Sequence, residues 1–126
     1  MSLATQKHTN PSEVTDFVIR YSDGLYLPMH RKAVTDTIQK HMDYGTLLTV
    51  RKQGEIVGVV RWNFISTNTI KVLDLVIHPD HRNKGVMKAM LIQGLMAFPY
   101  IKNMTFHRKK HHRDTNCLVR SFLGGR

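Results

Sequence analysis

The stretch that decides the fold is Lys71-Val72-Leu73-Asp74-Leu75-Val76-Ile77, His78-Pro79-Asp80-His81, Arg82-Asn83-Lys84-Gly85-Val86-Met87 and the apolar run that follows to Phe98. Its first part is mostly β-branched or aliphatic, which predicts a strand over residues 71–77. Pro79 ends that strand because proline has no N–H to give to a ladder. Apolar residues then recur at three- and four-residue spacing from Val86 to Phe98, which predicts a helix lying flat on a sheet.

The junction between this strand and this helix has the features of an anion site. The first turn of a helix carries N–H groups without an intrahelical partner, and the helix dipole adds partial positive charge there. A phosphate group fits such a terminus. Gly85 lets the backbone come close to a ligand, and Arg82, Lys84 and Lys88 add full positive charges.

These residues resemble the GNAT superfamily, the GCN5-related N-acetyltransferases. The family motif is Arg/Gln-x-x-Gly-x-Gly/Ala, and this chain has Arg82-x-x-Gly85-x-Met87, with Met87 in place of a small residue. The resemblance implies acetyl-CoA as cofactor. Its pantetheine arm would lie along Ile77, His78 and Pro79, and its pyrophosphate would be held by Arg82, Asn83, Lys84, Gly85, Val86, Met87 and Lys88.

The rest of the chain predicts further strands and one more helix. Strands are expected at residues 17–21, 47–51, 55–64, 100–107 and 117–119, and a helix at 29–42. Gly58 inside a predicted strand indicates a bulge or the close approach of another backbone. This order also resembles the GNAT core. It implies an α/β (α+β) fold with a mixed, mostly antiparallel central sheet, flanking helices and splayed strands at the cofactor site.

The C-terminal part departs from the family. GNAT proteins usually have another helix there, with a tyrosine that serves as general acid, but no tyrosine follows Tyr100. We therefore interpret the chain as a compact member with a divergent C-terminal motif, and we transfer no catalytic acid from that region.

Composition and charge set the class of protein. A chain of 126 residues predicts one domain, here residues 13–126 after a flexible N-terminus at 1–12. No apolar run is long enough to span a membrane, and the single cysteine fits a reducing compartment, so we expect a cytoplasmic protein. From Arg82 onward there are ten Lys and Arg against one acidic residue, Asp114. Such asymmetry indicates a phosphorylated cofactor, a polyanionic partner or a solvated basic surface.

Two residues are candidates for the base that accepts the proton of an amine. Asp74 alternates with Val72 and Val76 in the predicted strand, and a carboxylate among apolar neighbours suits a base near neutral pH. A structural, hydrogen-bonded aspartate explains the same pattern. His78 titrates in the right range, although an exposed turn residue is the alternative. The family's strand glutamate is replaced by Lys71.

The strongest basic run contains Arg108, Lys109, Lys110 and Arg113. It is expected to bind nucleic acid, to bind the 3′-phosphate of coenzyme A, or to be solvated. Nearby histidines and Cys117 fit no standard zinc spacing, so no metal site is predicted.

Three functions follow from these patterns. The first is an acyl-CoA-dependent N-acyltransferase that moves an acetyl group directly, without a covalent intermediate, to a small-molecule or protein amine. The second is a GNAT-fold protein, similar to small basic ones encoded by phages, that binds or modifies nucleic acid and has weak or no acetyltransferase activity. The third is an interaction module that kept the fold and lost the pocket. A monomer or a homodimer is expected.

Overall fold

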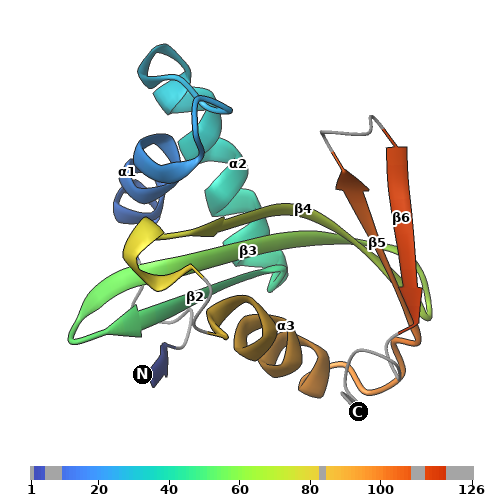
Figure 1. Cartoon of the computed structure of the whole chain (residues 1–126). Coiled ribbons are helices and arrows are strands. Elements are labelled where there is room, and N and C mark those ends of the chain that lie inside the picture. The colour runs from blue at the N-terminus through green and yellow to red at the C-terminus, as the bar shows by residue number, and fades with distance from the viewer. Residues whose placement is uncertain (1, 5–9, 83–84, 109–112, 119–126) are drawn as a thin grey trace.

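The computed structural model describes residues 2–4, 10–82, 85–108 and 113–118 (Figure 1). Within these residues one mixed sheet has the strand order β1-β2-β3-β4-β5-β6. The strands are β1 Ser2–Ala4, β2 Leu47–Lys52, β3 Glu55–Ser66, β4 Thr69–Ile77, β5 Asn103–Arg108 and β6 Arg113–Leu118. Only β4 and β5 pair in parallel, and the other neighbours are antiparallel.

The helices cover both faces of this sheet. They are α1 Pro11–Tyr21, α2 Arg31–Tyr44 and α3 Val86–Met96, with short 3-10 turns η2 Pro28–His30 and η3 Pro79–His81. Helices α1 and α2 lie on one face and α3 lies on the other (Figure 1). Two buried clusters fill the layers: one gathers Val14, Val18 and Ile38 against Val59 and Val76, and the other packs α3 against the opposite face. No helix in the described part of the chain is long and apolar enough to cross a membrane.

The first predicted strand, residues 17–21, is wrong because these residues form the end of α1. The helix begins at Asn10, whose side chain accepts a hydrogen bond from the Ser12 N–H at 2.8 Å, and Pro11 occupies the first turn. Val14, Phe17 and Val18 then face the sheet and are buried. The β-branched run favours a strand locally, but the cap and the helical spacing of the buried residues prevail. The same helix begins at Pro11, and Ser2–Ala4 pair with β2.

A bulge in β4 changes the side of the sheet to which Asp74 belongs. Arg61 pairs with Asp74 and Trp62 with Val72, so Leu73 is an extra residue opposite β3. Val72 consequently packs in the α3 cluster, whereas Val76 packs under α1 and α2. The predicted alternation of Val72 with Asp74 on one face is therefore wrong. The bulge turns the Asp74 carboxylate toward the α1–α2 layer, where it lines a pocket.

Gly58 lies beside a bulge, as expected, but what approaches it closely is a side chain and not another backbone. The register with β2 shifts beside it, between Val50 and Arg51, and helix α3 approaches it closely. A Cβ at this position would lie 2.5 Å from the Met90 sulfur. Because Met90 is fully buried, residue 58 sets how near α3 can come to the sheet.

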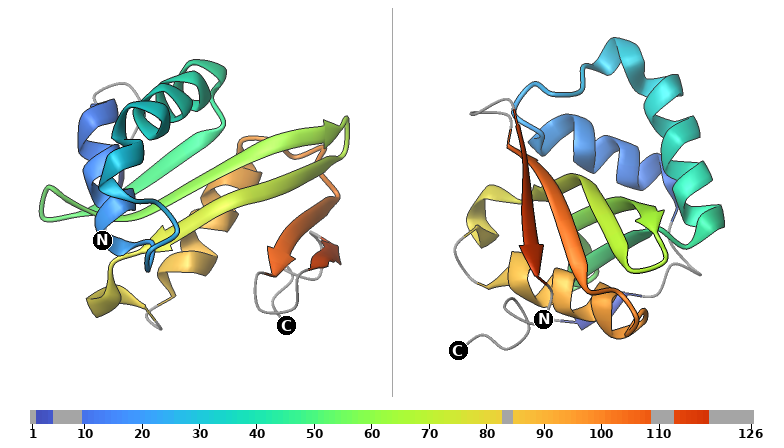
Figure 2. Two further views of the ribbon diagram at one scale, coloured as in Figure 1. Left: turned by 90° about the horizontal axis from the view of Figure 1, so that it is seen from above. Right: turned by 90° about the vertical axis from the view of Figure 1, so that its right-hand side faces the viewer.

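Strands β4 and β5 separate partway along their length. Their ladder runs from Thr69 with Asn103 to Val72 with Phe106, but β4 continues to Ile77. Figures 1 and 2 show β5 turning away from β4 beyond that point. The β4 edge from Leu73 to Ile77 is therefore not paired with any described strand on that side, which agrees with the predicted splay.

Candidate active site

The predicted anion site at the start of α3 has the expected backbone geometry. Gly85 adopts a left-handed conformation with φ 74°, and no side chain among the described residues caps the helix. The first intrahelical hydrogen bond runs from the Ala89 N–H to the Gly85 carbonyl, so the N–H groups of Val86, Met87 and Lys88 precede the helical ladder. A Cβ on Gly85 would touch nothing within 4 Å, so glycine serves the backbone conformation here and not the space.

The described side chains of this turn differ in their exposure to solvent. Val86 is buried, while Met87 is 47% exposed and Lys88 is also exposed. The Met87 side chain is therefore not packed into the core. Asn83 and Lys84, which were also predicted to bind the pyrophosphate, lie outside the described residues.

Arg82 ties this turn to the C-terminal end of α1. Its Nε donates to the Ile77 carbonyl at 3.0 Å and one terminal nitrogen donates to the Tyr21 carbonyl at 3.2 Å. The same guanidinium lies 3.6 Å from the Asp23 carboxylate. Arg82 thus connects the end of β4 to the end of α1 and the loop that follows it.

Of the three residues predicted to contact the pantetheine arm, Ile77 alone can offer an amide to it. The His78 N–H donates to the Val57 carbonyl at 2.9 Å, and Pro79 has no N–H. Backbone groups of successive strand residues point to opposite edges. Because the His78 N–H points to β3, the Ile77 N–H and carbonyl point to the open edge, where Arg82 reaches that carbonyl.

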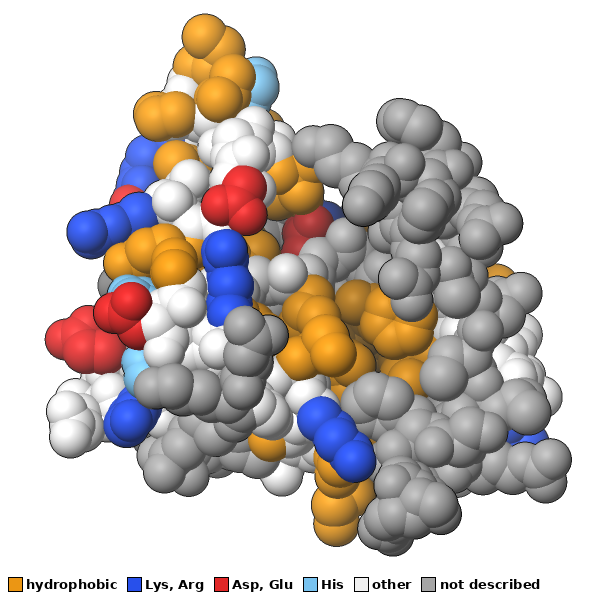
Figure 3. Space-filling model, viewed as in Figure 1, with side chains coloured by type: hydrophobic (Ala, Val, Ile, Leu, Met, Phe, Trp, Pro, Cys, Tyr) orange, Lys and Arg blue, Asp and Glu red, His pale blue; other side chains and the backbone are white. Residues whose placement is uncertain are grey.

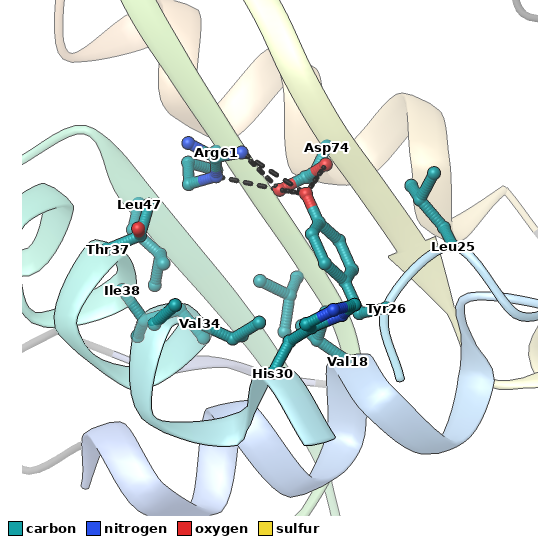
Figure 4. Close-up of a pocket in the computed structure, with 12 residues that line it drawn as sticks. Val18, Leu25, Tyr26, His30, Val34, Thr37, Ile38, Leu47, Arg61 and Asp74 are labelled. Carbon is teal, nitrogen blue, oxygen red and sulfur yellow. Dashed lines mark hydrogen bonds and ion pairs between the residues drawn. The ribbon is translucent and has the colours of Figure 1, made fainter. Parts of the chain in front are cut away.

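A cavity of about 390 Å³ lies between the helices α1 and α2 and the sheet (Figure 4). Its walls are mostly apolar, and its polar end is formed by Tyr26, Arg61 and Asp74. The remaining lining residues are Val18, Leu25, His30, Ala33, Val34, Thr37, Ile38, Leu47 and Val59.

The Asp74 carboxylate is hydrogen-bonded and ion-paired, which corresponds to the alternative of a structural aspartate and not to a carboxylate isolated among apolar groups. Tyr26 donates its hydroxyl to Oδ1 at 2.7 Å, with Oδ2 at 2.9 Å. Arg61 donates Nε to Oδ2 at 2.7 Å, and one of its terminal nitrogens lies 2.6 Å from the same oxygen. The Asp74 side chain is 9% exposed and that of Arg61 is 15% exposed. Burial of the phenol, followed by its hydrogen bond to Asp74, raises the pKa of Tyr26, so Tyr26 keeps its proton.

His41 extends this network into the protein. Arginine only donates, so the contact of 3.1 Å between Arg61 and His41 Nε2 makes that nitrogen an acceptor. The proton then resides on Nδ1, which donates to the Thr46 hydroxyl at 2.6 Å. Burial, followed by the charge of Arg61, lowers the pKa of His41, so its imidazole is neutral.

Acidification should therefore destabilise the protein through His41. Unfolded His41 takes up a proton below pH 6.5, but the folded protein resists this because its pKa is lowered. The contribution of His41 to the free energy of unfolding is fully present above that pH. It is lost as the pH falls toward the pKa of the folded state, at a slope of at most ~1.4 kcal/mol per pH unit. Urea denaturation between pH 5 and 7 measures the slope. We expect His41→Gln to flatten it and His30→Gln, an exposed histidine, to leave it unchanged. An unaltered slope in His41→Gln contradicts the assignment.

The two catalytic candidates do not lie together. The His78 Nδ1 accepts the Asp80 N–H at 3.1 Å, and its ring packs 4.5 Å from Tyr21 between ring centres. It lines a polar hollow with Asp80 and His81, whereas Asp74 lines the apolar cavity. Tyr26, Arg61 and His41 were missed from the sequence. Only Arg61 carries a local signal, as a charge within an otherwise apolar strand.

A further hollow, of about 340 Å³, follows the free edge of β4 and is called the β4-edge hollow below. It is lined by residues 73–77, by Arg82 and by the end of α1 with the loop after it. Leu25 and Asp74 line both this hollow and the apolar cavity. Asp74 therefore stands where the two spaces meet.

The other predicted sites are only partly described. Arg108 and Arg113 are paired residues of the β5–β6 hairpin, while Lys109 and Lys110 lie outside the described residues. Binding of nucleic acid by this run stays a prediction. Among the described side chains, no group of three or more His, Cys, Asp or Glu residues is placed to hold a metal ion.

Comparison with known proteins identifies the family. A sequence profile described as the acetyltransferase (GNAT) family matches residues 13–99, which is more than half of the chain. The chain belongs to the GNAT acetyltransferase family. The resemblance seen in the motif around Gly85 is thereby confirmed. No curated protein sequence matches the chain significantly.

Solved structures share the fold of this GNAT protein at low sequence identity. A protein of Pyrococcus horikoshii OT3 superposes with a TM-score of 0.68 at 15% identity, over 87% of this chain and 81% of that one. Diaminobutyrate acetyltransferase EctA from Paenibacillus lautus, solved with L-2,4-diaminobutyric acid and coenzyme A, gives 0.62 at 21% identity, covering 91% and 67%. An aminoglycoside 6'-N-acetyltransferase complexed with coenzyme A gives 0.67 at 10% identity, covering 84% and 61%. These likenesses confirm the predicted GNAT-like fold with its mixed, mostly antiparallel sheet.

Proposed function

We propose that this protein is an acetyl-CoA-dependent N-acetyltransferase that acts on a primary amine. One observation carries the proposal: the unpaired edge of β4, the Asp74 carboxylate and Arg82 line the same hollow, and a short turn after Arg82 leads to the start of α3. Two structural neighbours hold coenzyme A, which supports the same cofactor here. The site fits this cofactor because the start of α3 offers amides and positive charge for a diphosphate, and β4 offers a strand edge for an extended arm.

Each part of the site has a role in binding or orienting the reactants. The N–H groups of Val86, Met87 and Lys88, with the charges of Arg82 and Lys88, bind the pyrophosphate. The Ile77 N–H, on the open edge, donates to the pantetheine arm or to the thioester oxygen as negative charge develops there. Asp74 accepts a hydrogen bond from the acceptor amine where the apolar cavity meets the β4-edge hollow.

The reaction is a direct acyl transfer. The amine nitrogen, once it has lost its ammonium proton to solvent, forms a bond with the thioester carbonyl carbon. The carbon–sulfur bond breaks and coenzyme A leaves as the thiolate. The nitrogen then loses a proton and the thiolate sulfur takes one up, so the products are an amide and the free thiol. Holding amine and thioester together contributes several kcal/mol to such a reaction, so orientation by Asp74 is a sufficient role for it.

Coenzyme binding tests the proposal. Acetyl-CoA at about 100 times its Kd should raise the free energy of unfolding by ~2.7 kcal/mol and so raise the Tm. Arg82→Gln should weaken acetyl-CoA at least tenfold in isothermal titration calorimetry, because a charged hydrogen bond to phosphate contributes ~1.5–3 kcal/mol. Lys102→Gln, at an exposed lysine beyond α3, is the matched control and should bind normally. Absence of any binding at millimolar acetyl-CoA would remove the proposed function.

A further inference from the structure

We propose that the cavity between α1, α2 and the sheet is the acceptor pocket, and that it takes a monoamine with a compact apolar body and no carboxylate. The inference rests on the proposed function and adds the chemical class of its acceptor. Four observations carry it. The cavity has mostly apolar walls, it has a single carboxylate, and the Arg61 guanidinium is engaged by protein partners. The cavity also meets the β4-edge hollow at Asp74.

The walls of the cavity select an apolar body. At about 390 Å³ the cavity falls within the roughly 300–1,000 Å³ range of small-molecule sites. Aliphatic side chains from α1, α2, β2 and β3 surround it, among them Val34, Ile38 and Leu47, and Figure 4 shows them on the side opposite Asp74. A ligand that enters with its amine at Asp74 therefore places the rest of its atoms against hydrocarbon.

The charges of the pocket select one ammonium group. Asp74 is the single acidic residue among those that line the cavity, and Arg61 lies beside it. The Asp74 Oδ1 accepts from Tyr26 and keeps a further lone pair for a ligand, whereas Oδ2 already receives both Tyr26 and Arg61. A polyamine or an aminocyclitol sugar would bring several positive charges into a cavity whose lining has no second carboxylate to pair with them, which is costly.

The state of Arg61 disfavours a carboxylate on the acceptor. Its Nε and one terminal nitrogen contact Asp74, the latter also approaching the Tyr26 hydroxyl, and the other terminal nitrogen contacts His41. All three of its nitrogens thereby contact partners within the protein, through three hydrogen bonds and an ion pair. An amino acid bound with its amine at Asp74 would bring its own carboxylate beside the Asp74 carboxylate, with little left on Arg61 to compensate.

The approach to the pocket is also apolar. The connection between α1 and α2 carries Leu25, Leu27 and Met29, which are 48%, 43% and 80% exposed. Figure 3 shows hydrophobic side chains gathered at that end of the molecule. Leu25 lines both the apolar cavity and the β4-edge hollow. The connection between α1 and α2 therefore leads from the solvent to the point where the amine meets the thioester.

A set of related ligands tests this inference on the full chain. We expect 2-phenylethylamine to be acetylated with a kcat/KM at least about tenfold above those of spermidine and L-phenylalanine, since unpaired polar groups in a pocket cost large factors in specificity. In calorimetry with coenzyme A present, 2-phenylethylamine should bind and its uncharged analogue 2-phenylethanol should bind at least tenfold more weakly. Equal or better use of spermidine or L-phenylalanine overturns the inference. So does the absence of 2-phenylethylamine binding at millimolar concentration, with or without coenzyme A.

A variant that fills the pocket localises the effect. Ala33 lies on the α2 side of the cavity, and Ala33→Phe should weaken 2-phenylethylamine at least tenfold while leaving acetyl-CoA affinity unchanged. Gln39→Phe places the same side chain on an exposed position of α2 that does not line the cavity, and should change neither. If acetyl-CoA binds but Ala33→Phe leaves amine binding intact, the pocket assignment is wrong and the proposed function stands. If acetyl-CoA itself does not bind, the proposed function fails first.

Discussion

Replacing Arg61 by methionine should lower the free energy of unfolding by about 3–5 kcal/mol, because it leaves the Asp74 carboxylate buried without its cation. Asp74 is 9% exposed and receives two contacts from Arg61, at 2.6 Å and 2.7 Å. The same change removes the donor that Arg61 directs to His41. Urea denaturation at pH 7 should show a lower midpoint with an unchanged m-value, the signature of a stability change without loss of compactness.

The double variant Arg61→Met with Asp74→Leu separates the cost of an orphaned charge from the value of the pair. Removing both charges should restore most of the lost stability, since buried ion pairs add little over apolar residues of similar size. Lys32→Met breaks the Lys32–Asp36 pair on the exposed side of α2 and should leave the urea midpoint unchanged. The buried-pair account is wrong if Arg61→Met unfolds at the same urea concentration as Lys32→Met.

The local elements of the fold could be predicted because their signals are local. Strand β4, the turn after it and helix α3 occupy one stretch in which side-chain spacing, Pro79 and Gly85 agree. The hairpin between β2 and β3 could also be predicted, because its signals too lie within a short stretch of sequence. Residues 17–21 were assigned wrongly because a β-branched run favours a strand, while the cap that begins the helix lies earlier, at Asn10.

The candidate site depends on features that no local pattern contains. Whether Asp74 faces α1 and α2 or faces α3 is decided by the bulge at Leu73, which is a matter of register against β3. Tyr26 reaches Asp74 across 48 positions of the chain, from a connector that gave no signal. The turn proposed to bind phosphate, in contrast, would use backbone groups, and these follow from the strand-to-helix junction itself.

Two glycines of the α3 interface give the second large effect, with opposite signs for the same chemical change. Gly58→Ala should lower the free energy of unfolding by about 1–3 kcal/mol, because its Cβ meets the sulfur of the fully buried Met90 at 2.5 Å and an overpacked core must shift. Gly94→Ala, on α3 itself, meets only Trp62 at 3.9 Å and should stabilise by up to ~1 kcal/mol through helix propensity.

The shift caused by Gly58→Ala also reaches the cofactor site. Met90 and Val86 are the α3 side chains nearest to the added Cβ, and Val86 begins the helix whose amides we assign to the pyrophosphate. Moving that helix away from β3 displaces those amides relative to the free edge of β4, so one extended cofactor can no longer reach both in the same geometry. Gly58→Ala should therefore weaken acetyl-CoA in calorimetry, whereas Gly94→Ala should bind it normally. Normal affinity in Gly58→Ala, despite a lowered urea midpoint, would mean that the position of α3 is not what aligns the cofactor.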